Sequence, residues 1–358
     1  MMMHTFTVIA GVLAASAPAQ PAPPADVLVG VNYFAGWWEP LPNKWHDATG
    51  EDWRPRYPER VPTLGEYNTQ ETMDREIIAA ASHGVDFFAI LWYYNPPGTE
   101  AEPNARFLER GVTNFIASPE NHRMRFMLEF CNHPPFEVAT DEDWTRCVEL
   151  WTSWIQHPQY LRIDGKPVFK VHGFHHFYTQ NGRDPAFCKK RLDQLRQSVR
   201  DAGAGEMLIG CGVGEHDVIA EGHPAVSLFD FTAVYMGVPP LEQRSEDYPY
   251  KTLLDRAQVS WKTHGGDAIP HMPYLPAGWS PRPWHDPRPS FAFPTRGEWD
   301  GALSDIKAAL TTTSILGLPG QKAFTIYAWN EFGEGGIVAP TQGEGTMKLE
   351  GIQANFHP

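Results

Sequence analysis

Two glutamates near the carboxyl end of the chain, Glu331 and Glu334, are the residues best suited to chemistry. They stand in the segment Ala-Trp-Asn-Glu-Phe-Gly-Glu-Gly (328–335), where flanking glycines let the backbone turn tightly and hold the carboxyls close together. An aromatic setting can separate the two pKa values, so that one group donates a proton while the other accepts one or attacks. That division of labour cleaves glycosidic bonds. The alternative is an inert polar contact beside a solvated loop residue.

The elements that must position this pair alternate between apolar strands and amphipathic helices. The expected strands are Val27–Phe34, Val85–Tyr94, Arg125–Cys131, Pro167–Gly173, Glu206–Gly212, Phe229–Met236, Ala268–Tyr274 and Lys322–Asn330. The expected helices are Thr69–His83, Asn104–Ala117, Glu142–Gln156, Pro185–Ala202, a short one at His216–Glu221, Tyr250–His264 and Glu298–Thr313. This alternation predicts a single-domain α/β fold, a (β/α)8 TIM barrel. A doubly wound open sheet would need a glycine-rich loop after an early strand, and residues 35–40 read Ala-Gly-Trp-Trp-Glu-Pro instead.

Functional groups of such barrels gather at the carboxyl ends of the strands. The strand ends carry polar and aromatic side chains that we expect to bind substrate: Tyr33, Trp37, Trp38, Trp92, Tyr94, Glu129, Asn132, His172, Tyr235, His271, Tyr274, Trp279, Trp329 and Asn330. Tyr93, His133, Lys170 and Trp284 occupy similar positions. In the last strand, side-chain alternation predicts that Tyr327, Trp329 and Glu331 share one face, directed into the barrel mouth.

A histidine group after the fourth strand allows a different reading. His172 and His175 have the His-x-x-His spacing that suits zinc on a helical face, and His176 follows directly. A metal-dependent hydrolase using these histidines is therefore a rival prediction. Helical geometry is not expected at a strand end, so contacts with sugar hydroxyls, or satisfied loop histidines, are favoured.

Composition narrows the class of ligand. The net charge of −14 and the pI near 5.5 argue against nucleic acids and anionic membrane surfaces, which attract basic faces. Aromatic residues make up 13% of the chain and include 13 Trp, an abundance that fits stacking on sugar rings as well as a large aromatic core. No apolar run after the first residues approaches the roughly 20 residues that a membrane span needs.

The first residues predict export. An apolar run from Phe6 to Ala15 followed by Ser-Ala-Pro-Ala predicts a signal peptide at 1–19, then a Pro/Ala-rich tether at 20–26 and a catalytic domain at 27–358. We therefore expect a secreted or periplasmic protein. Of the four cysteines, Cys147 and Cys188 fall on consecutive predicted helices and could pair in an oxidising compartment; four buried free thiols is the other reading.

Three segments resemble one family. The segment at 328–335 is similar to the Trp-Asn-Glu-Trp-x-Glu-Gly motif of glycoside hydrolase family 99 and the WbsX-like proteins. Tyr-Leu-Arg-Ile-Asp-Gly-Lys-Pro (160–167) resembles the family's entry to strand four, and Gly-Trp-Ser-Pro-Arg-Pro-Trp (278–284) its segment after strand seven. The chain departs from the family pattern at Phe332, usually Trp, and at Ser280, usually Asp. Both departures bear on the walls of the substrate site.

The resemblance implies a barrel that works without a metal or cofactor on a polysaccharide or glycan. In the family's α-mannan enzymes, the first glutamate of the motif deprotonates the sugar 2-hydroxyl, the second protonates the leaving oxygen, and a 1,2-anhydro sugar forms with net retention. Carried over, Glu331 is the base and Glu334 the acid. A non-hydrolytic carbohydrate-binding or polysaccharide-biosynthesis accessory barrel remains the alternative that WbsX-like proteins suggest. An export signal favours degradation, since nucleotide-sugar donors are cytoplasmic.

Overall fold

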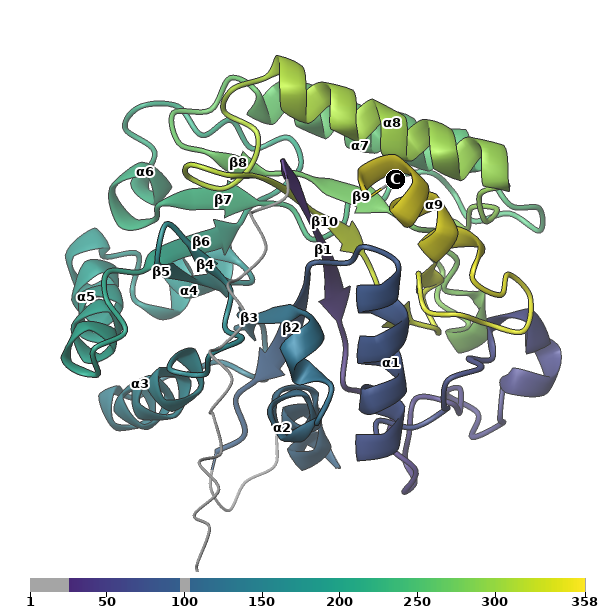
Figure 1. Cartoon of the computed structure of the whole chain (residues 1–358), viewed down its shortest axis with the longest axis horizontal. Helices are drawn as coiled ribbons and strands as arrows, with labels where there is room; N and C mark the ends of the chain where they lie inside the picture. The colour runs from purple at the N-terminus through teal and green to yellow at the C-terminus, as the bar shows by residue number, and fades with distance from the viewer. Residues whose placement is uncertain (1–25, 97–103, 358) are drawn as a thin grey trace, which may run out of the picture.

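The computed structural model describes residues 26–96 and 104–357, and its centre is a barrel of parallel strands (Figure 1). The parallel strands among these residues are β1 (Val27–Tyr33), β2 (Phe87–Tyr93), β3 (Arg125–Cys131), β5 (Lys166–Val171), β6 (Leu208–Gly212), β7 (Phe231–Ala233), β8 (His271–Met272), β9 (Tyr274–Pro276) and β10 (Lys322–Tyr327). Two-residue segments complete the set: β4 (Arg162–Ile163) pairs antiparallel with β5, and β11 (Asn330–Glu331) with β12 (Gly336–Ile337).

The strand order shows how the barrel closes. Neighbours follow the path β8-β7-β6-β5-β3-β2-β1-β10-β9, and every adjacent pair is parallel. The two ends of this path, β8 and β9, are consecutive stretches of chain separated by Pro273 alone. Proline cannot donate a ladder hydrogen bond, so the break at this position is expected. The result is a nearly closed barrel with eight strand positions, and the predicted (β/α)8 fold is confirmed.

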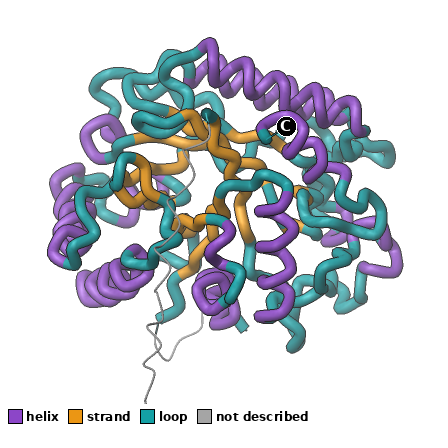
Figure 2. Tube along the Cα trace, in the orientation of Figure 1, coloured by secondary structure: helices purple, strands orange, loops and turns teal. Residues whose placement is uncertain are grey.

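Helices surround the strands on the outside (Figures 1 and 2). In the described residues the α-helices are α1 (Gln70–Ser82), α2 (Arg110–Ala117), α3 (Asp141–Ile155), α4 (Phe174–Gln180), α5 (Pro185–Asp201), α6 (Pro224–Leu228), α7 (Tyr250–His264), α8 (Arg296–Thr312) and α9 (Met347–Phe356). Short 3-10 turns are η1 (Arg54–Arg56), η2 (Pro58–Arg60), η3 (Ala105–Glu109), η4 (Asn121–Arg123) and η5 (Arg282–Trp284). The C-terminal α9, which no sequence pattern indicated, lies beside α8, and Trp299 Nε1 donates to the carbonyl of Lys348 at 2.9 Å.

The helix boundaries follow from capping side chains. Thr69 accepts a hydrogen bond from the Thr72 amide at the start of α1, and Gly84 follows the end of that helix with φ +81°. Thr295 and Glu298 form a reciprocal capping box at the start of α8. Such caps satisfy amides that a helix leaves without partners, and typically each is worth about 1 kcal/mol.

Apolar side chains form two layers. One fills the barrel interior, with Leu28, Phe87, Met127, Val168 and Met272 from five different strands. The second lies between the strands and the helices and is rich in aromatic rings. Two glycines give room for rings inside the barrel, because a Cβ at Gly30 or Gly210 would lie within 2.5 Å of the ring of Phe87 or Phe231 respectively.

Several predicted boundaries are corrected. The helix expected at His216–Glu221 does not form; α6 begins instead at Pro224, which favours a first helical turn, and His223 caps it. The expected strand Ala268–Tyr274 is divided at Pro273. The last strand ends at Tyr327 rather than at Asn330, so its alternation stops before the glutamates.

The predicted signal peptide at 1–19 lies outside the described residues, as does the tether at 20–26 apart from Asp26. Among residues 26–96 and 104–357, no helix is long and apolar enough to cross a membrane. Cys147 and Cys188 do not pair: both are free and buried, as are Cys131 and Cys211.

Candidate active site

A cavity of about 260 Å³ opens at the carboxyl ends of the barrel strands, and we call it the mouth cavity. Its lining comes from the ends of several strands and from the loops after them: Phe34, Lys44, Leu91, Tyr93, Leu108, His133, Phe136, His172, Tyr235, Trp284, Glu331 and Glu334. Its volume is near the lower end of small-molecule sites, about 300 Å³. Aromatic and apolar walls with a few convergent polar groups are typical of a site for a small polar ligand.

Glu331 and Glu334 both face this cavity from a tight turn after β10. The amides of Glu334 and Gly335 donate to the carbonyl of Glu331 at 3.1 and 2.8 Å, which folds the segment back on itself. Glu331 is 6% exposed, and its Oε1 accepts a hydrogen bond of 3.1 Å from the hydroxyl of Tyr235. Glu334 accepts from the hydroxyl of Tyr327 and lies 3.4 Å from Arg288 Nη2.

The environment raises the pKa of both carboxyls. Burial is the main cause that raises the pKa of Glu331 to about 8, and the charge of Glu334 adds to it. The hydrogen bond from Tyr235 lowers this pKa and so partly opposes the rise. Burial also raises the pKa of Glu334, and the hydroxyl of Tyr327 and the guanidinium of Arg288 oppose the rise. The Glu334 side chain keeps 21% exposure, so solvent tempers its increase. Because the two carboxyls are coupled, they titrate as a pair rather than independently.

A buried ionic network lies beneath one wall of the cavity. Glu129 is fully buried, and its Oε1 lies 2.9 Å from Lys170 Nζ and 2.6 Å from His172 Nδ1, while Asn32 donates to its Oε2 at 3.0 Å. Burial alone would raise the pKa of Glu129, but Lys170 and His172 outweigh it and lower the pKa to about 2. The ionised carboxylate fixes the ring of His172, which contacts the ring of Tyr235 at 4.8 Å between centroids. The network therefore orients two lining residues.

Lys44 brings a positive charge to the cavity from the long loop after β1. Its carbonyl oxygen accepts indole N–H hydrogen bonds from Trp53 at 2.8 Å and Trp284 at 2.9 Å. Its ammonium lies 5.7 Å from the ring centroid of Phe34 and 5.5 Å from that of Trp284. These contacts hold the backbone and the charge of Lys44 in place, and its charge lowers the pKa of both glutamates.

Of the residues expected to bind substrate, His172 and Tyr235 line the mouth cavity together with the two glutamates. Glu129 lies behind His172, as described above. Trp37 and Asn330 support the rim instead: Asn330 exchanges two hydrogen bonds of 2.8 Å with the backbone of Phe34, and the indole of Trp37 donates to the carbonyl of Asn330 at 2.7 Å. These hydrogen bonds connect the segment after β1 to the segment after β10.

A second cavity, of about 390 Å³, lies beside the first and shares Tyr93 with it. Trp92 and Tyr94 line this second cavity rather than the mouth cavity. Asn132 exchanges two hydrogen bonds of 2.9 Å with the backbone of Gly173 and braces the start of α4. Trp38 packs against Phe107 and donates to the carbonyl of Pro42.

Two residues expected at the mouth face the helix layer, which corrects their predicted placement. Tyr33 is fully buried and donates to Glu76 on α1 at 2.7 Å. Trp329 packs against Phe88, a residue that also contacts α2 through Phe115. Because β10 ends at Tyr327, the alternation that should have put Trp329 beside Glu331 does not reach it.

Two further residues expected to bind substrate lie outside the mouth cavity. Tyr274 is buried, and its hydroxyl lies 3.5 Å from Glu215. Trp279 is buried and stacks beneath the guanidinium of Arg288, 4.5 Å from the ring centroid. Trp279 therefore supports a residue that touches Glu334.

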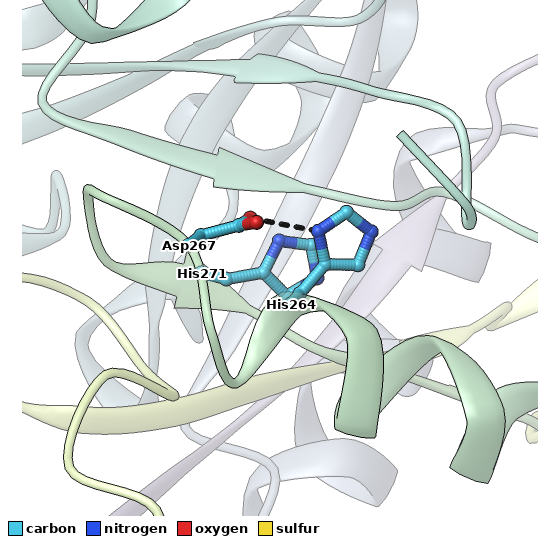
Figure 3. A group of neighbouring side chains, drawn as sticks. All are labelled: His264, Asp267 and His271. Atoms are coloured by element: carbon cyan, nitrogen blue, oxygen red, sulfur yellow. Dashed lines mark hydrogen bonds and ion pairs between the residues drawn. The ribbon is translucent and has the colours of Figure 1, made fainter. Parts of the chain in front are cut away.

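The expected place of His271 at the mouth is also wrong. Its neighbour Met272 points into the barrel, so His271 points outward, where its ring stacks on that of His264 at the end of α7, 3.9 Å between centroids (Figure 3). Asp267 accepts from Nδ1 of His264 at 2.7 Å, and Thr232 contacts Nδ1 of His271 at 2.8 Å. Burial lowers the pKa of His271 well below its ordinary value, with smaller contributions from His264 and Lys170.

Metal-ligating side chains gather away from the predicted histidine group. Within the described chain, the one cluster of three such residues is His264, Asp267 and His271, all buried (Figure 3). A metal lies in the plane of an imidazole that binds it, and the two rings are parallel to within 3°, an arrangement that does not converge on one ion. His175 and His176 lie exposed on α4, a helix that the sequence reasoning did not expect, and His172 uses Nδ1 to bind Glu129.

The two departures from the family pattern lie outside the cavity. Phe332 is buried against Trp45, with nearly parallel rings 5.5 Å apart. Ser280 is buried and accepts a hydrogen bond of 2.8 Å from Arg60. Neither residue lines the mouth cavity.

Five lining residues were missed by the sequence reasoning: Phe34, Lys44, Leu91, Leu108 and Phe136. Leu91 could have been found, because it lies two positions before Tyr93 and so on the same face of β2. Lys44 and Phe136 lie in loops without periodic signals.

The sequence matches no known family model and no curated protein. Among solved structures, the fold is similar to a glycoside hydrolase-like protein at TM-score 0.61 and 15% identity, covering 95% of this chain and 97% of that one. It is also similar to the family 99 endo-alpha-mannosidase from Bacteroides thetaiotaomicron, at TM-score 0.58 and 15% identity over 87% of each chain. A family 5, subfamily 18 protein from Streptomyces cattleya, solved with GlcNAc, gives 0.52 and 12% over 92% and 80%. At these identities the likeness establishes a shared barrel, and the family that the sequence segments resemble is among its neighbours.

Proposed function

We propose that this chain is a glycoside hydrolase that cleaves a polysaccharide or glycan with retention, using Glu331 and Glu334. The observation that carries the proposal is that both carboxyls face one cavity at the barrel mouth with raised pKa values. Two coupled carboxyls with raised pKa values can supply an acid and a base near neutral pH. The glycoside hydrolase folds among the structural neighbours support the same class of reaction.

In the proposed mechanism Glu331 takes the proton of the sugar 2-hydroxyl, and that oxygen attacks the anomeric carbon. Glu334 gives its proton to the glycosidic oxygen as the bond to the leaving sugar breaks. Water then attacks the anomeric carbon of the anhydro sugar, Glu334 takes its proton, and Glu331 returns a proton to the 2-oxygen. Two inversions give net retention, and both carboxyls regain their starting states. The roles rest on the resemblance at residues 328–335.

This order of steps needs a proton on Glu334 and a carboxylate at Glu331, although burial raises the pKa of Glu331 to about 8. The two carboxyls titrate as a pair, so a new partner for either one redistributes the proton. The 2-hydroxyl is an added donor to Glu331, beside that of Tyr235, and donors favour the carboxylate form. The glycosidic oxygen is an acceptor that favours a proton on Glu334. Substrate binding thus drives the required exchange.

We also propose that the chain acts after export, on the basis of the predicted signal peptide at 1–19. Extracytoplasmic glycans are then its substrates. Detection of the processed protein in the periplasm or medium, against a variant lacking residues 1–19, tests this location. Cytoplasmic retention of the full-length chain contradicts it.

A screen of the purified protein against a polysaccharide panel tests the function. The expected result is release of new reducing ends from at least one glycan, and nuclear magnetic resonance of the first product should show the anomeric configuration of the substrate. Glu149 is exposed on the outer side of α3, so Glu149→Gln is a matched control for substitutions at the pair. Binding of a glycan without cleavage by the wild type would support the carbohydrate-binding alternative.

A further inference from the structure

We propose that Lys44 is a specificity-determining residue that binds an anionic substituent, a carboxylate or a sulfate, on the sugar held beside Glu331 and Glu334. The inference rests on the proposed function, because it assigns the substrate class of the same site. The proposed substrates of the mouth cavity are therefore acidic glycans rather than neutral ones.

Lys44 is held in position by more contacts than a solvated lysine has. Two indole N–H groups, from Trp53 and Trp284, bind its carbonyl oxygen, so the backbone at this point is fixed. The ring of Trp284 also lies beneath the ammonium, and the ring of Phe34 lies on another side at 5.7 Å. Cation–π contacts of this kind hold an ammonium without satisfying its hydrogen-bond donors. The ammonium is therefore held at a fixed position, and its N–H groups can still bind an oxygen atom.

The ammonium of Lys44 has no carboxylate within 4 Å among residues 26–96 and 104–357. Nearby cations differ in this respect: Lys170 lies 2.9 Å from Glu129, and Arg288 lies 2.7 Å from Asp286. Three donor hydrogens in a partly buried setting need acceptors, which water supplies in the free site and a ligand would supply in a complex. An anionic oxygen is the acceptor that forms the strongest such contact.

Other groups on the cavity wall are compatible with an anion. The titratable groups that share the cavity with Lys44 are Tyr93, His133, His172, Tyr235, Glu331 and Glu334. Burial raises the pKa of both glutamates, which limits the negative charge that the pair places opposite Lys44. The chain's net charge of −14 is spread over the surface, and salt screens it beyond about 8 Å at physiological ionic strength. The charges that line the cavity, rather than the net charge of the chain, therefore determine whether an anionic substituent binds there.

A simpler role for Lys44 would be electrostatic alone, through the glutamates. A lysine that only tunes the pair would change acidic and neutral sugars alike, since it would touch neither. A lysine that binds the substituent discriminates between them. The test therefore compares ligands that differ in one charged group.

Binding can be measured by titration calorimetry or nuclear magnetic resonance, with the full chain and simple sugars as probes. The probes are glucose, galactose and mannose, their uronates and their 6-sulfates, and the proteins are the wild type, Lys44→Met, Lys44→Arg and Lys166→Met. Lys166 is an exposed lysine at the amino end of β5, opposite the mouth, and serves as the matched control. Melting temperatures of the four proteins establish that each is folded.

We expect at least one anionic probe to bind about tenfold or more tightly than its neutral parent. Lys44→Met should remove this difference, Lys44→Arg should keep most of it, and Lys166→Met should behave as the wild type. Preference for uronates identifies a carboxylate, and preference for 6-sulfates a sulfate. Equal binding of charged and neutral sugars to the wild type, or an equal loss for both in Lys44→Met, overturns the inference.

The two proposals can fail separately. Because the probes are simple sugars, binding is measured without any cleavage, so a protein that hydrolyses no glycan can still show the Lys44 preference. Conversely, cleavage of a neutral glycan with no preference for anionic probes would leave the hydrolase proposal in place and refute the role of Lys44.

Discussion

The hydroxyl of Tyr235 donates a hydrogen bond of 3.1 Å to Oε1 of Glu331, joining residues 96 positions apart in the sequence. Tyr235 follows β7 and Glu331 follows β10, so the contact spans the barrel mouth. The same tyrosine ring packs against His172, whose orientation depends on Glu129. One carboxyl of the pair is thereby connected to the buried ionic network on the opposite wall.

Replacing Tyr235 with Phe should therefore alter the pH dependence of hydrolysis. The hydrogen bond lowers the pKa of Glu331 against burial and the charge of Glu334, so its loss raises that pKa further. A base must be unprotonated to act, and the acidic limb of the kcat/KM profile should move to higher pH. At neutral pH we expect kcat/KM to fall about tenfold. An unchanged acidic limb would mean that Glu331 does not titrate as the base.

Replacing Glu129 with Gln should destabilise the protein. The substitution leaves Lys170 as a buried charge without its partner, and breaking a buried pair in this way costs about 3–5 kcal/mol. Chemical denaturation followed by tryptophan fluorescence measures the free energy of unfolding. Glu149→Gln on the exposed side of α3 is the control and should change it little. An equal free energy of unfolding for the two variants would show that the Glu129 network does not stabilise the fold.

How far the sequence predicts this site is clearest from residues that share a strand end. Glu331 and Glu334 could be found because a buried strand leads into glycines that bend the chain at the mouth. His271 and Trp329 were assigned to the same mouth and lie on its outer side. A residue's position along a strand indicates which end of the barrel it occupies, but its face depends on where the strand starts and breaks. The early end of β10 stops the alternation before Trp329, and in the two-residue strand β8 it is Met272, not His271, that faces the interior.

The fold was predictable to a greater extent than the cavity lining. Strand and helix periodicity depends on neighbours in sequence, and it predicted the barrel with errors at short elements such as α4 and α6. Lys44 reaches the cavity through contacts with Trp53 and Trp284, the latter 240 residues away. Such contacts between loops leave no periodic trace in the sequence. Glu129 was expected to bind substrate, and the structure places it instead in contact with Lys170 and His172.

Acid should destabilise the fold through His271. Its folded-state pKa lies well below the unfolded value of about 6.5, so the unfolded chain binds the proton first as pH falls. Stability from the neutral ring is thus present above about pH 6.5 and is lost below it, at up to about 1.4 kcal/mol per pH unit. Denaturation midpoints of the wild type and His271→Asn between pH 7 and 5 measure this. The variant should show a shallower slope, and parallel slopes would contradict the assignment.

The roles within the glutamate pair can be separated with the leaving group. An acid is dispensable when the leaving group needs no proton, so Glu334→Gln should cleave dinitrophenyl glycosides while losing about 100-fold or more on the natural glycan. Glu331→Gln should be impaired on both, because the attack at the anomeric carbon still needs the base. If Glu331→Gln cleaved dinitrophenyl glycosides and Glu334→Gln did not, the roles of the two glutamates would be reversed.

The most direct measurement is the rate of reducing-end release from a glycan that the wild type cleaves, compared across Glu331→Gln, Glu334→Gln and Glu149→Gln. The two cavity variants should each lose about 100-fold or more in kcat, as expected for an acid or base that acts in the transition state, while Glu149→Gln matches the wild type. Circular dichroism should show all three folded. Wild-type rates in folded Glu331→Gln and Glu334→Gln would contradict the claim that this pair carries the chemistry.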